Sequence, residues 1–248
     1  MPNLPTHIHF AIEAGSYIES DSIESNFSAY LVGSTTPDMR AITKKDRSVY
    51  HFVNLDFKGV GEGLSNLVTS HPKWFDLANV DNETRAFMAG YASHLILDET
   101  WVTLMFRPYF QDSKLFPDPA KALVMDRAMQ LGLDKLNWMS MKPYLSDMQD
   151  YRLGVDVDFL ESEPVEDWKN WIFRLLGADF TWERLLFMAT RISRGDETHP
   201  AIRYANEFIA NPEEMFDDLI HTLPEGVLNE FENAAVSNIE KHVNRFIG

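Results

Sequence analysis

The chain has 248 residues, enough for one large domain or two small ones, and its 45% hydrophobic and 24% charged residues are ordinary for a globular protein. It carries 22 Lys and Arg against 38 Asp and Glu, and the resulting net charge of −16 disfavours sequence-independent binding to nucleic acid or to anionic lipid. There is no cysteine, which excludes disulfides, thiolate zinc sites and cysteine nucleophiles.

The first predicted helix covers residues 7–18, where small and apolar side chains recur from His7 to Ile18 at the spacing of one helix face. An apolar segment at 26–32 follows and leads into the sequence Gly33-Ser34-Thr35-Thr36-Pro37-Asp38. We predict a loop there, because a proline biases the residue before it away from helical conformation.

The next predicted helix runs from about residue 83 to 105, with Asp81 or Asn82 as its cap. Apolar side chains cover nearly every face of this segment, and a helix that is apolar all round is buried. It nevertheless carries His94 and Asp98. A buried imidazole and carboxylate must be paired, hydrogen-bonded or metal-bound, because their desolvation alone costs several kcal/mol.

The second half of the sequence reads as further amphipathic helices separated by Pro and Gly. They are expected at about 119–129, 134–145, 165–176, 182–192, 200–210, 212–221 and 224–246. The segment 112–120, with two prolines, is the best candidate joint. The sequence thus predicts one all-α domain over 1–248, a multi-helix bundle with a metal-site half (1–110) and a helical extension (111–248).

His94 and Asp98 are four residues apart, so their side chains share one face of the helix and suit a common cation. Taken alone, the pair fits a buried His–Asp hydrogen bond better than a metal site. Asp38 alone fits a turn residue, and His51, between two aromatic residues, fits a core histidine. His7 alone fits a structural role at the start of the first helix.

In order along the chain, these residues resemble a known pattern. The segments are Thr6-His7-Ile8-His9-Phe10-Ala11, Gly33-Ser34-Thr35-Thr36-Pro37-Asp38, Tyr50-His51-Phe52 and Gly90-Tyr91-Ala92-Ser93-His94-Leu95-Ile96-Leu97-Asp98. Together they resemble the zinc-dependent phospholipase C family, which is related to the S1/P1 nucleases. The resemblance covers residues 1 to about 105 and implies an all-α fold of that type with extra C-terminal helices.

The resemblance implies a role for each matching residue. Asp38, His51, His94 and Asp98 would hold one metal, and His7 would hold a second with Asp98 as the bridge. Such a set of His and Asp ligands suits zinc, iron or manganese. Where three-metal members of the family have a further His, about ten residues after the first His of the His-x-x-x-Asp helix, this chain has Leu104. We therefore expect one or two ions.

The implied chemistry is attack of a metal-activated water on a phosphate ester, with Asp38 or Asp98 accepting its proton. Between two presumed ligands lies a cation-rich segment, 40–47. Its Arg40 and Lys44 are candidate phosphate-binding residues, as is Arg107 beyond the central helix. A solvated loop is the alternative interpretation of segment 40–47.

The predicted function is a phospholipase C-like phosphodiesterase or phosphoesterase acting on a small phosphate ester. Two alternatives stay open: a nucleotide phosphohydrolase, and a non-catalytic helical protein that retains a partial site for metal binding or structure. The start of the chain shows no signal peptide, and its apolar runs are too short for a membrane span. We therefore expect a cytoplasmic protein without stable membrane insertion or nucleic-acid binding.

Overall fold

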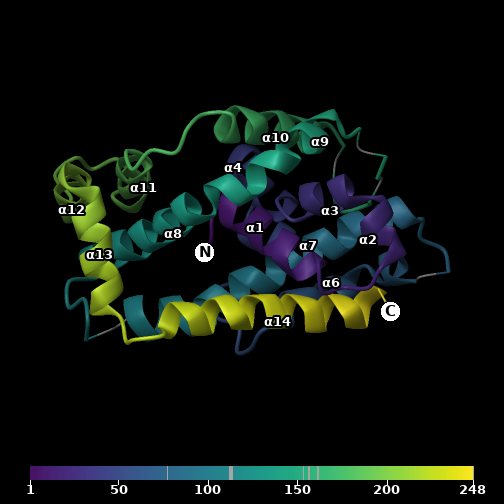
Figure 1. Cartoon of the computed structure of the whole chain (residues 1–248), viewed down its shortest axis with the longest axis horizontal. Coiled ribbons are helices and arrows are strands. Elements are labelled where there is room, and N and C mark those ends of the chain that lie inside the picture. The colour runs from purple at the N-terminus through teal and green to yellow at the C-terminus, as the bar shows by residue number, and fades with distance from the viewer. Residues whose placement is uncertain (77, 112–113, 153, 156, 161, 248) are drawn as a thin grey trace.

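The computed structural model describes residues 1–76, 78–111, 114–152, 154–155, 157–160 and 162–247. Over these residues the chain folds into helices and contains no strand, which confirms the all-α prediction (Figure 1). In chain order, the segments are α1 (Leu4–Gly15), α2 (Asp21–Ser25), α3 (Phe27–Gly33), the 3-10 turn η1 (Thr36–Met39), α4 (Arg40–Thr43), α5 (Arg47–His51), α6 (Glu62–Ser70), η2 (Pro72–Phe75), α7 (Asn82–Trp101), the π-helical segment η3 (Val102–Phe110), α8 (Pro119–Met141), η4 (Lys142–Tyr144), α9 (Leu145–Asp150), α10 (Ser162–Leu176), α11 (Arg184–Ile192), α12 (Pro200–Ala210), α13 (Pro212–Thr222) and α14 (Val227–Ile247).

Helix α7 is the buried centre of the molecule, as its apolar surface predicts (Figure 1). Every residue from Ala86 to Trp101 is buried, and α1, α2, α3 and α14 all pack against it. Asp81 caps the helix, since its side chain accepts a hydrogen bond from the Thr84 amide at 2.9 Å. The helix ends earlier than predicted and continues as the wider η3.

Two glycines let α3 and α7 touch backbone to backbone. A β-carbon added at Gly33 would lie 2.1 Å from the Phe87 carbonyl oxygen, and one at Gly90 would lie 1.8 Å from that of Tyr30. Such a close approach is possible only without side chains at both positions. The crossing brings the turn that follows Gly33, with its Asp38, against the face of α7 that carries His94.

The helical extension wraps around this centre (Figure 1). Helices α9 and α10 lie on one side, α14 runs along the opposite side, and α11, α12 and α13 gather at one end. The two helices predicted at 119–129 and 134–145 are wrong in one respect, because they form the single helix α8. Helix α8 continues through Gly132, where a β-carbon would lie 1.9 Å from the ring of Phe216.

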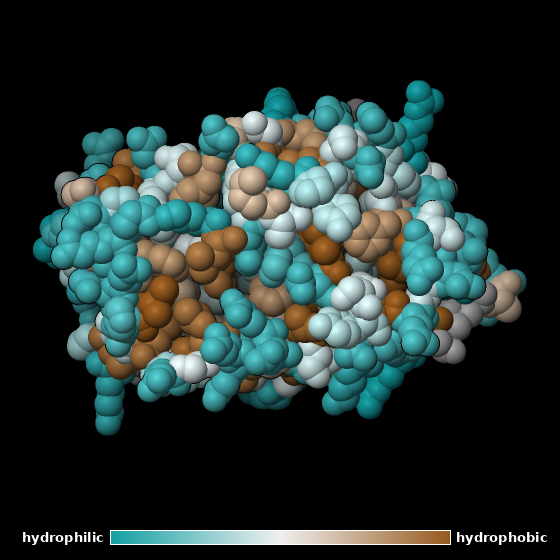
Figure 2. Space-filling model, in the orientation of Figure 1, coloured by the Kyte–Doolittle hydropathy of each residue, from teal (hydrophilic) through white to brown (hydrophobic). Residues whose placement is uncertain are grey.

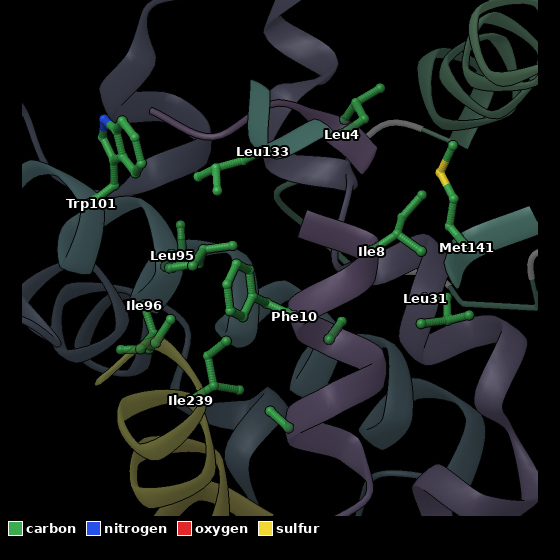
Figure 3. Packing of buried hydrophobic residues seen from close by; sticks show 14 of the residues in the cluster. Leu4, Ile8, Phe10, Leu31, Leu95, Ile96, Trp101, Leu133, Met141 and Ile239 are labelled. Atoms are coloured by element: carbon green, nitrogen blue, oxygen red, sulfur yellow. The ribbon is translucent and has the colours of Figure 1, made fainter. Parts of the chain in front are cut away.

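One hydrophobic cluster joins the two halves of the chain. In Figure 3, Ile8 and Phe10 of α1 lie among side chains from α7, α8 and α14, including Leu95 and Ile239. The predicted joint at 112–120 separates η3 from α8; its residues 112–113 lie outside the described residues. The core therefore holds the N-terminal helix of the metal-site half against the extension.

The surface is mostly hydrophilic in the view of Figure 2, with hydrophobic side chains showing between polar ones. This agrees with an acidic chain that buries its apolar residues. Within the described residues, every helix is too short or too polar to cross a bilayer. The short helices α2, α4, α5 and α6 were not predicted, because segments of four to nine residues carry too little periodicity.

Candidate metal centre

His94 is held in one orientation by the turn that follows α3. Its Nδ1 lies 2.8 Å from the carbonyl oxygen of Ser34, and both groups are buried. A carbonyl can only accept, so Nδ1 must carry the proton and donate it. Nε2 is then left with a lone pair, the state in which a histidine binds metal.

Asp98 is the carboxylate at the centre of the site and is 1% exposed. Its Oδ2 lies 2.9 Å from Nη2 of Arg47 and 3.2 Å from Nε2 of His51, and its Oδ1 lies 3.4 Å from Nε2 of His7. Burial acts to raise the pKa of Asp98, but the Arg47 charge and the two imidazoles hold that pKa well below its usual value. Asp98 is therefore an ionised carboxylate inside the protein.

The three imidazoles are packed too closely to be charged together. The rings of His7 and His94 stack at 3.7 Å between centroids with 6° between their planes, and the ring of His51 lies 5.3 Å from His94. Burial lowers the pKa of His51, and burial together with His7 lowers the pKa of His94 well below its usual value. Neutral imidazole is the form that coordinates a metal.

Asp38 completes the group from the turn η1. Its Oδ1 lies 3.8 Å from Nε2 of His51, and its side chain is 27% exposed. The side chains of His7, His51 and His94 are fully buried. Asp38 is thus the member of the five-residue set that opens the site toward solvent.

The donor atoms of these residues fit a divalent cation. Among the described residues, both ring nitrogens of His7 and His51, Nε2 of His94 and Oδ1 of Asp98 are buried without a hydrogen-bond partner. Uncompensated buried polar atoms are costly, so such a concentration points to a bound group. Ligand atoms lie within 4.8 Å of one another in two triads, His7–His94–Asp98 and Asp38–His51–His94.

The structure therefore brings together all five residues that the sequence predicted as metal ligands. His94 belongs to both triads, and the two oxygens of Asp98 lie near His7 and His51, so Asp98 as the bridge between two ions stays a prediction. Leu104 lies in η3, beyond the end of the helix that holds His94 and Asp98. Metal occupancy and the number of ions stay predictions.

Of the three predicted phosphate-binding residues, two lie beside the site. Arg40 and Lys44 line a pocket of about 630 Å³ that also includes Asp38. Arg107 is engaged elsewhere, since its Nη2 donates to the carbonyl oxygens of Leu55 and Phe57 at 2.9 and 2.6 Å. Its guanidinium also stacks 4.5 Å from the Phe57 ring, which indicates that Arg107 anchors this loop.

Two further charged residues support the site and were missed or undervalued from the sequence. Arg47 was grouped with a solvated segment, yet it is buried and binds Asp98. Glu99 was given no firm role; its carboxylate accepts the backbone amides of Gly61, Glu62 and Gly63 at the start of α6. Burial raises the pKa of Glu99 to about 7. No sequence spacing marks either contact.

Residues 6–101 match the family described as zinc dependent phospholipase C. This confirms the resemblance that the sequence predicted over residues 1 to about 105. The matched phospholipase C segment contains all five candidate ligands and ends at the last residue of α7. No curated protein and no solved structure matches the chain.

Proposed function

We propose that the protein is a metal-dependent hydrolase of phosphate esters, with its centre at His7, Asp38, His51, His94 and Asp98. The observation that carries the proposal is a set of buried polar atoms without a hydrogen-bond partner among the described residues: both ring nitrogens of His7 and His51, Nε2 of His94 and Oδ1 of Asp98. The match of residues 6–101 to a zinc-dependent family supports zinc as the ion and an ester of phosphate as the substrate class.

A divalent ion held by these residues would supply Lewis acidity, which polarises a phosphoryl oxygen and makes water acidic enough to react near neutral pH. The residues themselves have distinct tasks. Ser34 fixes the His94 ring through its Nδ1, so that Nε2 stays directed into the site. Arg47 keeps Asp98 ionised, which preserves its capacity as a ligand.

Asp38 is our choice for the proton acceptor. The Asp98 carboxylate is shared among one arginine and two histidines and is 1% exposed. Asp38 faces the pocket, where water and substrate can reach it. Arg40 and Lys44, from the same pocket, are placed to bind the non-bridging phosphate oxygens.

The test is the metal content of purified protein, measured by elemental analysis after growth in metal-replete medium. We expect at least one divalent ion per chain in the wild type and in His9→Ala, and loss of metal in His94→Ala and Asp38→Ala. His9 is the matched control, since it lies on the same helix as His7 and pairs with Ser140 at 2.9 Å, outside the site.

Activity is tested with bis-p-nitrophenyl phosphate, a phosphodiester with a coloured leaving group. Wild-type protein loaded with Zn²⁺ should hydrolyse it, and both ligand variants should lose the activity. Metal-free wild type from replete medium would overturn the proposal, as would retention of metal in both ligand variants. Turnover of nucleotides while other phosphate esters are inert would assign the site to a nucleotide phosphohydrolase instead.

A further inference from the structure

The helical extension supplies about half of the residues that line the pocket beside Asp38. Residues of α8, α10 and α11 form much of its wall, and the start of α1 and the segment after η1 form the rest. A smaller hollow of about 290 Å³ shares Asp38, Arg40 and Arg191 with it. Because Asp38 is the exposed member of the metal centre, this pocket is where the part of a substrate beyond the reacting phosphate would lie.

Positive side chains are concentrated in this pocket. Its lining includes five of the 22 Lys and Arg of a chain whose net charge is −16. They are Arg40, Lys44, Lys45, Arg184 and Arg191. The lining acids are Asp38, a candidate metal ligand, and Asp134, whose two oxygens accept from Asn3 at 2.8 Å and Thr6 at 2.7 Å. The local field therefore favours a negative ligand.

The cations differ in their freedom to bind a ligand. Arg184 donates to the carbonyl oxygens of Leu175 and Asp179 at 3.2 and 3.4 Å, so it is part of the wall. Lys44 donates to the carbonyl oxygen of Ala41. Arg40 has a buried Nε without a partner, and the side chain of Arg191 is exposed with no polar contact among the described residues. Arg40 and Arg191 thus have donors available for a ligand.

An apolar wall lies across the same pocket. Trp168 and Trp171 stack with ring centroids 4.9 Å apart, and Phe187 leaves 67% of its surface exposed. Aromatic walls can bind a quaternary ammonium group, as well as hydrocarbon. Five lining cations oppose an ammonium group, however, because each adds repulsion in a partly enclosed site. The two features are reconciled by a ligand with an anionic group and an apolar portion.

We propose that this pocket selects phosphate esters whose second substituent carries its own anionic group next to an apolar portion, and that Arg191 recognises that group. The inference rests on the proposed function for the position of the reacting phosphate. It assigns a substrate class to the site and a task to α11, which lies outside the phospholipase C segment.

The test compares two phosphate monoesters with head groups of opposite charge. Phosphocholine carries a trimethylammonium group, and 2-sulfoethyl phosphate carries a sulfonate on the same two-carbon chain. Binding is measured by isothermal titration calorimetry on chelator-treated protein, so that it does not depend on metal or turnover. We expect the sulfonate to bind about tenfold tighter, because it meets several cations at once.

The matched variants are Arg191→Gln in the pocket and Arg174→Gln, an exposed position on α10 outside it. Arg191→Gln should weaken sulfonate binding about two- to fivefold, the range expected for one exposed ion pair. Arg174→Gln, which removes the same charge from the protein, should leave it unchanged. Far-ultraviolet circular dichroism confirms that both variants are folded.

Substrate selectivity is tested in the Zn²⁺-loaded protein with two p-nitrophenyl phosphodiesters, one with the 2-sulfoethyl group and one with choline as the second substituent. A higher kcat/KM for the sulfonate ester supports the inference. Equal values, or preference for the choline ester, would overturn it while leaving the proposed function intact, whereas no hydrolysis of either ester would count against the proposed function. The inference would also be overturned if 2-sulfoethyl phosphate did not bind at 20 mM (roughly the weak limit of such contacts). Equal effects of Arg191→Gln and Arg174→Gln on its binding would overturn it too.

A further experiment distinguishes a lipid substrate with an anionic head from a soluble one. Dihexanoyl phosphatidylglycerol phosphate, whose head carries a second phosphate, and dihexanoyl phosphatidylcholine, both below their aggregation concentrations, are compared with the soluble esters. Preference for the anionic lipid over both soluble esters indicates that Phe187 and its apolar surroundings receive acyl chains. Preference for the soluble sulfonate ester indicates a small anionic substrate; either result supports the charge selection.

Discussion

The metal-site half and the helical extension place their charged groups differently. In the first, His7, His94 and Asp98 are at most 1% exposed and contact one another. In the second, Arg191 and its aromatic neighbours line an open pocket. Buried groups at short range must match in charge and orientation, so few substitutions are tolerated. Exposed residues that line a pocket can be substituted at little cost in stability, so such a surface is suited to determining substrate specificity.

The largest effect should come from the crossing of α3 and α7, tested by Gly90→Ala. The new methyl would meet the Tyr30 carbonyl oxygen, a backbone atom that cannot move without shifting a helix. We expect the free energy of unfolding to fall by about 3 kcal/mol or more, since overpacking in a rigid core costs 1–3 kcal/mol and sometimes more. Urea denaturation measures it.

The matched substitution in the extension is Gly132→Ala. There the methyl meets the ring of Phe216, a side chain that can rotate away, and alanine gains helix propensity. The net loss should stay near 1 kcal/mol or less. Equal destabilisation by the two alanines would remove the distinction between a rigid metal-site half and a more adaptable extension.

A second prediction concerns Asp134, a buried carboxylate of the extension that binds Asn3 and Thr6 of the metal-site half. Burial raises the pKa of Asp134 from 3.8 to about 6. Between these values the unfolded chain loses a proton that the folded protein keeps, so folding becomes less favourable as the pH rises. The loss is complete above pH 6 and amounts to about 3 kcal/mol.

Asp134→Asn lacks this titration, so the wild type and the variant should diverge between pH 4 and 6. Relative to the wild type, the asparagine protein should gain stability across this range and then keep a constant difference up to pH 8. Urea midpoints at half-unit pH steps measure it. A difference that is independent of pH would show that Asp134 does not titrate in this window.

The third prediction tests the one described hydrogen bond between the Trp168 indole and the metal-site half. Its Nε1 donates to the buried carbonyl oxygen of Thr35 at 3.1 Å, three residues before Asp38. Trp168→Phe should cost about 1–2 kcal/mol, because the carbonyl loses its partner. Trp171→Phe is the control, since the structure describes no hydrogen bond from that indole. Thermal denaturation of both variants measures the cost.

Much of the metal centre could be predicted because several of its ligands lie close in sequence to each other or to the residues that shape their surroundings. His94 and Asp98 share a helix face, and Gly33 and Pro37 shape the turn that carries Asp38. The all-α class followed from periodicity and prolines. These features leave a trace in the sequence because neighbouring residues produce them.

The remainder depended on contacts between distant residues. Arg47 gives no sign in the sequence that it will bind Asp98, 51 residues away, rather than water. The continuity of α8 through Gly132 depends on Phe216, and the pocket depends on α10 and α11 reaching a turn near residue 38. Local patterns carry no information on such pairings, so the sequence prediction left the extension without a role.

The smallest effect separates two arginines that the sequence treated alike. Arg40 lines the pocket, and its buried Nε has no hydrogen-bond partner. The guanidinium of Arg107 instead donates to the loop carbonyl oxygens of Leu55 and Phe57. In the Zn²⁺-loaded protein, Arg40→Gln should raise KM for bis-p-nitrophenyl phosphate about tenfold, the scale of a lost charged hydrogen bond. Arg107→Gln should leave KM within about twofold and lower the free energy of unfolding by about 1 kcal/mol. If Arg107→Gln instead raised KM with no loss of stability, the loop would have to move in the presence of substrate, and substrate binding would extend beyond the pocket onto the metal-site half.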